Sequence, residues 1–431
     1  MTYGLIGKTL VHSYSKEIQE ALGRYTYDLI SLSPEEMPGF IKLREYDGLN
    51  VTIPYKQDVI PLCDEISPLA QAIGAVNTLY WENPEGKTPE ERGKLIGHNT
   101  DYTGFLYAAS RAGIDFAGKN VLILGTGGTS LTTRKAASDK GAASIRIASR
   151  HKGAEGETDH VIGSTPVSFV SYDDLPEIAE SVDVIINATP VGTYPKNLQS
   201  IISLRDFPNC RGAMDVIYNP FRTALLLEAE ELRIPYSNGL PMLVAQATAA
   251  AGFFLGTPGE FEKENERIIT AMEKDIRNIT LIGMPGSGKT TVGRHLAEIS
   301  GKKFVDLDDE IAAEAGMSIP EIFQREGEEG FRKRETEVCR RFGKENRLVI
   351  AAGGGAVLRK ENVQALRQNS IVIHVKRPLE QLAMDGRPLS KDMDTLRRME
   401  TERMPVYEKA ADVTYENTAD GSFGEELKEL I

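Results

Sequence analysis

The sequence predicts an α/β protein built from more than one domain. Short apolar runs alternate with helical patterns along most of the chain, as they do in layered α/β folds. A chain of 431 residues is too long for one compact core, so two or three domains are expected. Two glycine-rich loops divide it, one directly after the apolar strand 121–124 and one directly after the apolar strand 279–282.

The composition is that of an ordinary globular protein, with 41% hydrophobic and 26% charged residues. A net charge of −13 argues against a nucleic-acid partner, because such binding needs a basic face. It does not exclude anionic small molecules, which local basic groups and backbone amides hold. The longest apolar patch, residues 245–255, is too short to span a membrane.

The predicted location is the cytoplasm. Residues 1–17 lack a basic segment that leads into an apolar stretch, so no signal peptide is expected. Cys63, Cys210 and Cys339 lie far apart without metal-ligand spacing, which is typical of reduced thiols. The sequence does not decide between a monomer and a homo-oligomer.

Between the halves, residues 260–275 predict a helix whose apolar face is Phe261, Ile268, Ile269, Met272 and Ile276. This helix is either a joint that limits the relative motion of the halves or the last helix of the first half. The pattern leaves both readings open.

The second glycine-rich loop predicts an ATP site. Residues 283–290 fit the pattern G-x-x-x-x-G-K-[ST], between a strand and a helix with Val292, Leu296 and Ile299 on one face. Glycines let the backbone amides turn toward phosphate, and the helix N-terminus attracts it. Lys289 is expected to reach the β- and γ-phosphates and the Thr290 hydroxyl to bind Mg²⁺. The other expected nucleotide-binding residues are Gly283, Gly286, Ser287, Gly288 and Thr291.

Two aspartates follow the next apolar strand. Asp306 is placed to hold a Mg²⁺-bound water, and Asp308 to accept the proton of a substrate hydroxyl. Farther along come Phe331-Arg332 with Glu335, a glycine triplet at 353–355, Arg387-Pro388-Leu389 and Arg403 with Tyr407.

This ordered set resembles the shikimate kinase family from about residue 276 to the end. The resemblance implies a P-loop kinase domain at 276–431 with a parallel sheet. It implies that Arg332 and Arg403 bind the shikimate carboxylate, a task that suits the planar guanidinium. It further implies that Asp308, Gly354 and Gly355 contact shikimate, and that Arg387 lies in a lid over ATP and supports the transferring phosphoryl group.

The first glycine-rich loop, Gly125-Thr126-Gly127-Gly128, is a weaker signal, since Ser130 replaces the third glycine of the dinucleotide pattern. About twenty residues later a strand ends in Ser149-Arg150-His151-Lys152. An NAD enzyme carries an acidic residue there, whereas arginine accommodates a 2′-phosphate. Arg150, helped by Lys152, therefore indicates NADP. The alternative reading is a solvated basic turn.

Lys56 and Asp101 suit the reduction of a ketone. Lys56 follows a predicted strand, and Asp101 comes forty-five residues later. An ammonium protonates the developing alkoxide as hydride arrives, and a carboxylate orients it.

With the motifs around Ser13, Asn77, residues 187–190, residues 215–220 and residues 239–246, this pair resembles the shikimate dehydrogenase family over residues 1–272. The resemblance implies a catalytic pair of Lys56 and Asp101. It implies a discontinuous substrate domain (1–101 and 239–272) around a Rossmann NADP domain (102–238). The residues it implies in the substrate pocket are Ser13, Ser15, Thr52, Asn77, Tyr218 and Gln246, with Gly239 beside the cofactor.

Together the resemblances imply a bifunctional shikimate-pathway enzyme. The first half would reduce 3-dehydroshikimate to shikimate with NADPH, and the second would phosphorylate shikimate from ATP and Mg²⁺. The sequence departs from the dehydrogenase pattern at Thr9, Lys16, Thr126 and Thr129, where the family has proline or alanine. Two alternatives stay open: a dehydrogenase half that prefers quinate and NAD, and a degenerate half that only binds shikimate or regulates the kinase.

Overall fold

The computed structural model describes residues 2–10, 13–150, 158–382, 393–417 and 427. The chain divides into two compact units. Unit 1 comprises residues 1–191, 200–218 and 228–271, and unit 2 comprises residues 192–199, 219–227 and 272–431. The chain therefore passes from one unit to the other five times, which the sequence did not indicate.

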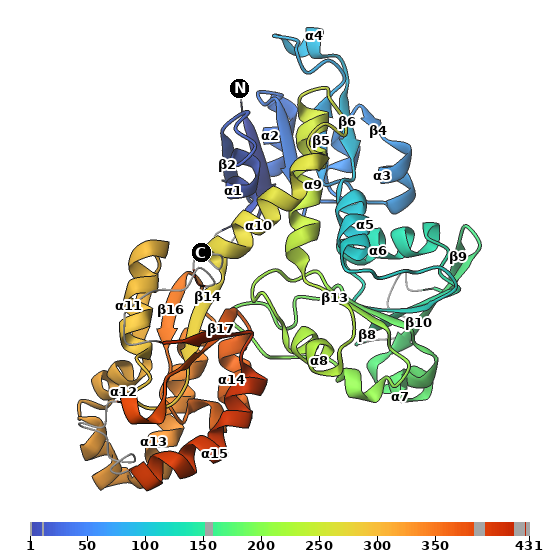
Figure 1. Ribbon diagram of the computed structural model, residues 1–431. Coiled ribbons are helices and arrows are strands. Elements are labelled where there is room, and N and C mark those ends of the chain that lie inside the picture. Colours follow the sequence, from blue (N-terminus) through green and yellow to red (C-terminus); the bar gives the residue numbers. More distant parts are fainter. Residues whose placement is uncertain (1, 11–12, 151–157, 383–392, 418–426, 428–431) are drawn as a thin grey trace. The chain divides into compact units, whose positions relative to one another are not determined.

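Unit 1 begins with a six-stranded mixed sheet in the order β2-β1-β3-β5-β6-β4 (Figure 1). Its first strands are parallel, and β5 runs antiparallel to both β3 and β6. The strands are β1 (Tyr3–Gly7), β2 (Tyr27–Ser31), β3 (Gly48–Val51), β4 (Glu65–Ile66), β5 (Thr78–Trp81) and β6 (Leu95–His98). The helices are α1 (Ser15–Glu20), α2 (Met37–Leu43), η1 (Ile60–Leu62), α3 (Pro68–Ile73) and α4 (Pro89–Arg92).

Helix α9 (Gly239–Phe254) returns the chain to this first sheet from far along the sequence. It is apolar on nearly all sides and almost wholly buried, as expected of a helix enclosed by other elements. Phe254 lies against the backbone of Gly48 on β3, where a side chain on residue 48 would clash with its ring. This packing explains why residues 239–254 join the first sheet.

The second sheet of unit 1 has the order β13-β12-β11-β7-β8-β10-β9, with only β9 antiparallel to its neighbour. The order reverses at β7, from which the chain builds outward first on one side and then on the other. The strands are β7 (Asn120–Leu124), β8 (Ser144–Ser149), β9 (His160–Ile162), β10 (Thr165–Ser171), β11 (Val184–Asn187), β12 (Gly212–Asp215) and β13 (Tyr236–Ser237). The helices are α5 (Asp101–Arg111), α6 (Gly128–Asp139), η2 (Tyr172–Asp174), α7 (Leu175–Ile178), η3 (Ala179–Ser181), η4 (Leu204–Asp206) and α8 (Ala224–Leu232), of which α8 has its residues 224–227 in unit 2.

Helix α6 packs on this sheet although its sequence is polar. Ser130, Thr132 and Thr133 are fully buried beside Ala136 and Ala137. The Thr133 hydroxyl donates a hydrogen bond to the carbonyl of Ser130, so the helix backbone satisfies it. Small side chains of this kind let the helix pack closely against the strands.

Unit 2 contains a five-stranded parallel sheet in the order β15-β16-β14-β17-β18. The strands are β14 (Asn278–Ile282), β15 (Lys303–Asp306), β16 (Leu348–Ala351), β17 (Ser370–Lys376) and β18 (Val413–Glu416). Two helices lead into unit 2: η5 (Glu262–Glu264), which is still part of unit 1, and α10 (Asn265–Ile276), which crosses the boundary at residue 272. The helices of unit 2 itself are α11 (Lys289–Ser300), α12 (Leu307–Ala315), α13 (Ile319–Gly343), η6 (Ala356–Leu358), α14 (Lys360–Arg367), η7 (Leu379–Gln381) and α15 (Met393–Ala410). The central strand, β14, leads directly into the second glycine-rich loop.

Two sequence predictions need correction here. Val292 and Leu296 are buried, but Ile299 is 45% exposed, because α11 has turned that position toward solvent near its end. The helix expected over residues 260–275 is α10, which begins at Asn265 after the short η5. All five residues of its predicted apolar face are buried, and the boundary between the units falls within it.

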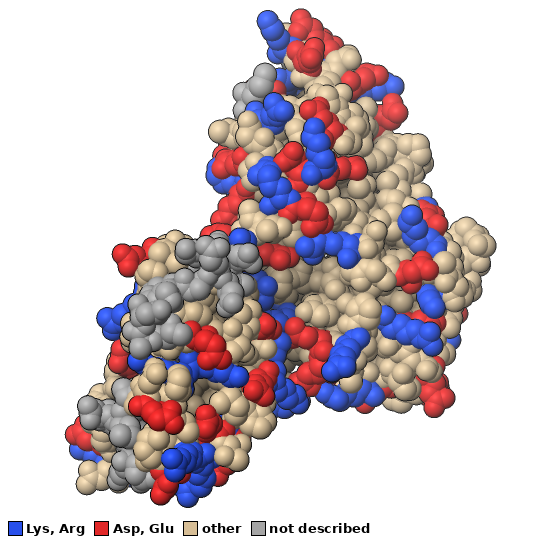
Figure 2. All heavy atoms as spheres, viewed as in Figure 1, with Lys and Arg blue, Asp and Glu red and all other residues tan. Residues whose placement is uncertain are grey.

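No helix within the described ranges is long and apolar enough to cross a membrane. On the face drawn in Figure 2, lysines and arginines are interspersed with acidic side chains and do not gather into one basic patch.

Candidate active sites

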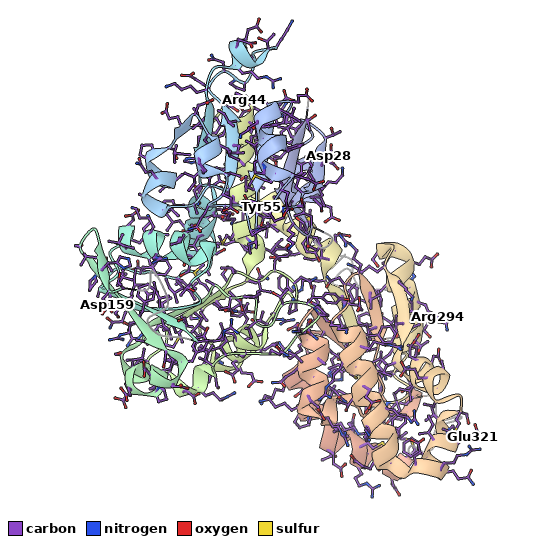
Figure 3. All side chains as sticks on the ribbon, turned by 180° about the vertical axis from the view of Figure 1, so that it is seen from behind. Asp28, Arg44, Tyr55, Asp159, Arg294 and Glu321 are labelled. Carbon is purple, nitrogen blue, oxygen red and sulfur yellow. The ribbon has the colours of Figure 1, made fainter. Side chains whose placement is uncertain are left out.

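Lys56 and Asp101 form a close ion pair in unit 1. Lys56 Nζ lies 2.5 Å from Asp101 Oδ2, and their side chains are only 13% and 10% exposed. Asp101 is the first residue of α5, where the helix dipole favours a negative charge. The preceding Tyr55 is buried and donates its hydroxyl to the carbonyl of Leu32, which anchors the backbone beside the lysine (Figure 3).

A buried polar network holds two of the predicted pocket residues. The Asn77 side-chain amide donates to Gln246 Oε1 at 3.3 Å, and Asn77 Oδ1 accepts the backbone N–H of Thr100 at 2.7 Å. The hydroxyls of Thr78 and Thr100 lie 2.9 Å apart. Thr100 precedes Asp101, so this network fixes the start of α5 and with it the carboxylate. Thr78 and Thr100 were not predicted as site residues; in the sequence they are marked only by their position next to Asn77 and Asp101.

The two predicted serines lie together at the start of α1. Ser13 Oγ is 3.0 Å from Ser15 Oγ. Between them, the Tyr14 ring lies 5.4 Å from the ring of Tyr218, measured between centroids. Burial, with a smaller effect of Tyr14, raises the pKa of Tyr218 to about 12. Tyr218 therefore stays protonated at neutral pH and keeps a hydroxyl that can donate.

The first glycine-rich loop lies at the point where the second sheet reverses its strand order, the usual ligand-binding place in such sheets. Gly125 has φ +99°, and a side chain there would come within 2.6 Å of Thr189 Cγ2, after β11. A Cβ on Gly128 would lie 3.8 Å from Lys56 Cδ. The loop and the Lys56–Asp101 pair therefore adjoin. Thr126, within this loop, is exposed.

At the end of β8, Ser149 is half-buried and pairs in register with Ser171 of β10, while Arg150 is exposed. Burial raises the pKa of Tyr172, and the positive charge of Arg150 opposes that rise. Thr52 follows β3 and donates its backbone N–H to Ile6. A side chain on Gly239 would clash with the carbonyl of Val216. Lys152 lies outside the described residues.

In unit 2, the second glycine-rich loop has the geometry of a phosphate cradle. Gly283, Gly286 and Gly288 all have positive φ, from +87° to +143°, a backbone conformation that residues with a Cβ atom rarely adopt. Lys289 Nζ donates to the carbonyls of Gly283 and Met284 at 3.0 and 2.9 Å. Ser287 is buried, and the exposed Thr291 follows in the first turn of α11.

Oxygen donors for a divalent cation lie beside this loop. Thr290 Oγ1 donates to Asp306 Oδ2 at 2.8 Å, which brings together the two predicted metal-site residues. Hydroxyl and carboxylate oxygens suit Mg²⁺. Asn417, which the sequence analysis missed, donates to the carbonyl of Ser287 at 2.7 Å and supports the loop from the end of β18. No sequence motif marks it, because its role depends on the strand order of the sheet.

Asp308 lies beside the glycine triplet, with its carboxylate next to Gly353. The residue as a whole is exposed at the start of α12. The surrounding protein desolvates the carboxylate, and this effect, followed by the charge of Asp306, raises its pKa. A side chain on Gly353 would lie 2.8 Å from Asp308 Oδ1 and 3.0 Å from Glu335 Oε1, so only glycine keeps this space open.

The two predicted carboxylate-binding arginines meet at the glycine triplet. Arg403 Nη1 donates to the carbonyl of Gly354 at 3.1 Å, and Gly355 packs against the guanidinium of Arg332. Arg332 forms an ion pair with Glu335 at 2.9 Å, and Glu335 is only 1% exposed. Both arginines are 7% exposed, so their guanidinium groups are held in fixed places. Arg387 lies outside the described residues.

Family models match all three parts of the chain. The model described as shikimate dehydrogenase substrate binding domain matches residues 5–79, and the one described as shikimate / quinate 5-dehydrogenase matches residues 107–201. The shikimate kinase model matches residues 285–429. A shikimate dehydrogenase (NADP(+)) of Clostridium beijerinckii is 35% identical over 257 residues, 58% of this chain and 89% of the relative. A shikimate kinase of Nitrosococcus oceani is 46% identical over 144 residues, 32% of this chain and 76% of the relative.

The chain belongs to both families. Its first part is a shikimate dehydrogenase family member and its last part a shikimate kinase family member, which confirms the resemblances. The crystal structure of shikimate dehydrogenase 1 from Peptoclostridium difficile is 32% identical, with a TM-score of 0.55 over 63% of this chain and 98% of that one. A chorismate mutase/shikimate 5-dehydrogenase fusion protein from Clostridium acetobutylicum is 33% identical with the same TM-score, over 63% of this chain and 97% of that one. The predicted α/β class is confirmed as well.

Proposed function

We propose that this chain is a bifunctional enzyme that reduces 3-dehydroshikimate to shikimate with NADPH and then phosphorylates shikimate from ATP and Mg²⁺. The proposal rests on the observation that this one chain contains two sites, in each of which the predicted residues lie close together. In the dehydrogenase site, the Lys56–Asp101 pair adjoins a dinucleotide loop. In the kinase site, the glycine triplet 353–355 contacts Pro285 of the phosphate cradle, Asp308 and the two arginines.

In the dehydrogenase, NADPH supplies the hydride. Lys56 donates a proton to the oxygen of the reduced carbonyl, and Asp101 orients the ammonium. Ser13 and Ser15 bind the substrate carboxylate, while Thr52, Asn77, Tyr218 and Gln246 bind its other groups. Gly125, Gly127, Gly128 and Gly239 let the backbone approach the cofactor, and Ser149, Arg150 and Lys152 receive the 2′-phosphate.

In the kinase, ATP with Mg²⁺ supplies the phosphoryl group. Asp308 accepts the proton of the shikimate hydroxyl, and its raised pKa makes it a better base than a free aspartate. Arg332 and Arg403 bind the shikimate carboxylate, with Gly354 and Gly355 beside it. Lys289 and Arg387 stabilise charge on the transferring group, and Thr290 and Asp306 hold the cation.

The predicted domains remain part of this proposal. Residues 1–101 with 239–272 form the substrate domain, residues 102–238 the NADP domain and residues 276–431 the kinase. The free thiols of Cys63, Cys210 and Cys339 support a cytoplasmic location.

NADPH consumption by the purified protein with 3-dehydroshikimate, without ATP, tests the reductase. We expect rapid oxidation of NADPH and a much slower reaction with NADH, because Arg150 favours the 2′-phosphate. Shikimate and ATP are then supplied in a separate assay for the kinase. A protein that phosphorylates shikimate but does not consume NADPH would carry a degenerate dehydrogenase half. Faster turnover of quinate with NAD than of shikimate with NADP would show that the dehydrogenase half prefers quinate and NAD.

A further inference from the structure

The side-chain amide of Asn77 has one orientation that its surroundings favour. Its Oδ1 atom lies 2.7 Å from the backbone nitrogen of Thr100, which can only donate a hydrogen bond. If the amide were turned over, its NH2 group would face that N–H and the bond would be lost. Asn77 is only 2% exposed, so both buried groups would then lack a partner. The NH2 group therefore lies toward Gln246, and it donates to Gln246 Oε1 at 3.3 Å.

The hydroxyl of Thr78 supports the same orientation. Thr78 is fully buried, and its Oγ1 atom lies 2.9 Å from Asn77 Oδ1. Asn50 Nδ2 approaches this hydroxyl at 3.3 Å as a donor, so Thr78 accepts a hydrogen bond on that side. Its single proton is left for Asn77 Oδ1 or for Thr100 Oγ1, which is also 2.9 Å away. In the second case the Thr100 hydroxyl can donate to Asn77 Oδ1 at 3.2 Å, so either arrangement provides a donor for that oxygen.

Asn50 is held so that it donates toward Thr78. The two residues are direct partners in the pairing of β3 with β5. Asn50 Oδ1 accepts the hydroxyl of Tyr27 at 2.7 Å and Gln19 Nε2 at 3.2 Å, so its NH2 group must face the other way. Tyr27 is fully buried, and burial raises its pKa well above the ordinary value, so its hydroxyl stays protonated. Donation therefore runs in one direction along this row of side chains, from Tyr27 to Asn77.

We infer that Thr78 is a positioning residue for the substrate, because it fixes the Asn77 amide with its NH2 group toward Gln246 and the substrate. Of the two protons on Asn77 Nδ2, one is donated to Gln246, and the other is available to the substrate. The substrate oxygen that meets Asn77 must therefore accept a hydrogen bond, as a hydroxyl or carbonyl oxygen can. All residues in this argument belong to unit 1. The inference rests on the proposed function, in which Asn77 binds the substrate.

Steady-state kinetics of the full-length protein test this role with the Thr78→Val variant, which exchanges the hydroxyl for a methyl group. We expect the dehydrogenase KM for shikimate to rise about fivefold, the equivalent of one lost hydrogen bond, while KM for NADP stays unchanged. Thr78→Ser keeps a hydroxyl and should restore KM for shikimate to within about twofold of the parent. In an Asn77→Ala background, Thr78→Val should cause no further rise, because Thr78 acts through Asn77.

Thr248→Val is the matched control for the loss of a buried hydroxyl. Thr248 is 1% exposed and also belongs to unit 1, but its Oγ1 atom lies 2.6 Å from Asn265 Oδ1. The control variant should leave KM for shikimate as in the parent, because it does not change the surroundings of Asn77. A rise equal to that of Thr78→Val would show a general loss of packing and would overturn the inference.

Asn77→Ala alone separates failure of this inference from failure of the proposed function. An unchanged KM for shikimate in that variant would remove Asn77 from the proposed site, and the inference would fall with it. A raised KM in Asn77→Ala beside a parental KM in Thr78→Val would overturn only the positioning role. The same follows if Thr78→Ser does not restore KM, or if Thr78→Val raises it further in the Asn77→Ala background. Should Thr78→Val fail to fold, Thr78→Ala takes its place in each comparison.

Discussion

At the scale of single residues, the kinase site depends on charges whose surroundings differ sharply. Asp308 is an exposed residue whose carboxylate has a pKa raised by desolvation and then by Asp306, whereas Glu335 is 1% exposed and paired with Arg332. The first geometry suits a group that exchanges a proton with substrate. The second suits a group that holds an arginine in one orientation.

Asp308→Asn should lower kinase kcat by about 100-fold or more, because the amide cannot accept the hydroxyl proton. KM for shikimate should change little, since shape and polarity are kept. Asp309→Asn is the matched control, as Asp309 is exposed on the same first turn of α12. A coupled assay of ADP release measures both, and normal turnover by Asp308→Asn would remove it as the base.

The stability of the protein should fall in acid partly because of His374. This residue is 1% exposed, stacks against Tyr407 and has a pKa lowered to about 4, mainly by burial. The unfolded chain, with an ordinary pKa of about 6.5, binds more protons between those values, so stability is lost as pH falls through that window. At pH 5.5 the loss amounts to about 1 kcal/mol.

Urea unfolding at pH 7.5 and 5.5 measures this effect, with the His374→Phe variant as the comparison. The variant should lose about 1 kcal/mol less than the parent on acidification. An equal loss in both proteins would mean that His374 does not contribute.

Contacts between site residues were largely predictable from the sequence where both residues belong to a motif. The Lys56–Asp101 and Thr290–Asp306 pairs were both expected, and both pairs are in contact. Glu335 and Asn417 received no role, because what they touch depends on tertiary packing and on the order of strands. Glu335 was named only as part of the kinase motif, and no motif includes Asn417.

At the scale of elements, the glycine loop of the dehydrogenase carries two threonines that the core does not enclose. Thr126 is exposed and Thr129 is half-buried. Gly125 differs from them, because its positive φ and its closeness to Thr189 leave no room for a side chain.

Replacing Thr126 or Thr129 by alanine should change KM for NADPH by less than about threefold, as expected of surface substitutions. Gly125→Ala should raise it more than about tenfold, because the left-handed backbone and the contact with Thr189 would distort the turn. NADPH titration at saturating 3-dehydroshikimate measures all three. A large gain from Thr126→Ala would instead show that the threonine obstructs the cofactor.

The two strands that precede the glycine-rich loops were predicted within one residue, 121–124 for β7 and 279–282 for β14, because apolar runs that end at a glycine mark them clearly. The helix faces were less certain. Ile299 was expected to be buried and is not, since an apolar residue near a helix end can satisfy the sequence pattern without meeting the core.

At the scale of the whole molecule, each unit contains the whole of one proposed catalytic pair. Lys56 and Asp101 are both in unit 1, and Lys289 and Asp308 are both in unit 2. The two activities are therefore expected to be separable by single substitutions at these residues. What the sequence did not indicate is that residues 192–199 and 219–227 belong to unit 2, because their partners lie far away along the chain.

Lys56→Ala should reduce dehydrogenase turnover by at least about 100-fold and leave kinase turnover within twofold of the parent. Lys289→Ala should do the reverse, because it removes the charge at the phosphates. Both assays are run on one preparation of each full-length variant. Loss of both activities from a folded variant would contradict two independent catalytic sets.

Because the chain crosses between the two units five times, segments that pack together within unit 2 are synthesised at different times. Phe221 and Arg222 leave the ribosome 148 residues before Asn369 and Ser370, which bind them. At a bacterial or eukaryotic rate of about 5 to 20 residues per second, that gap lasts about 7 to 30 s. The dehydrogenase sequence is thus complete, with this segment still uncovered, before the end of the kinase exists. The last part of the messenger RNA to be translated therefore encodes the residues that cover a segment encoded in its middle part.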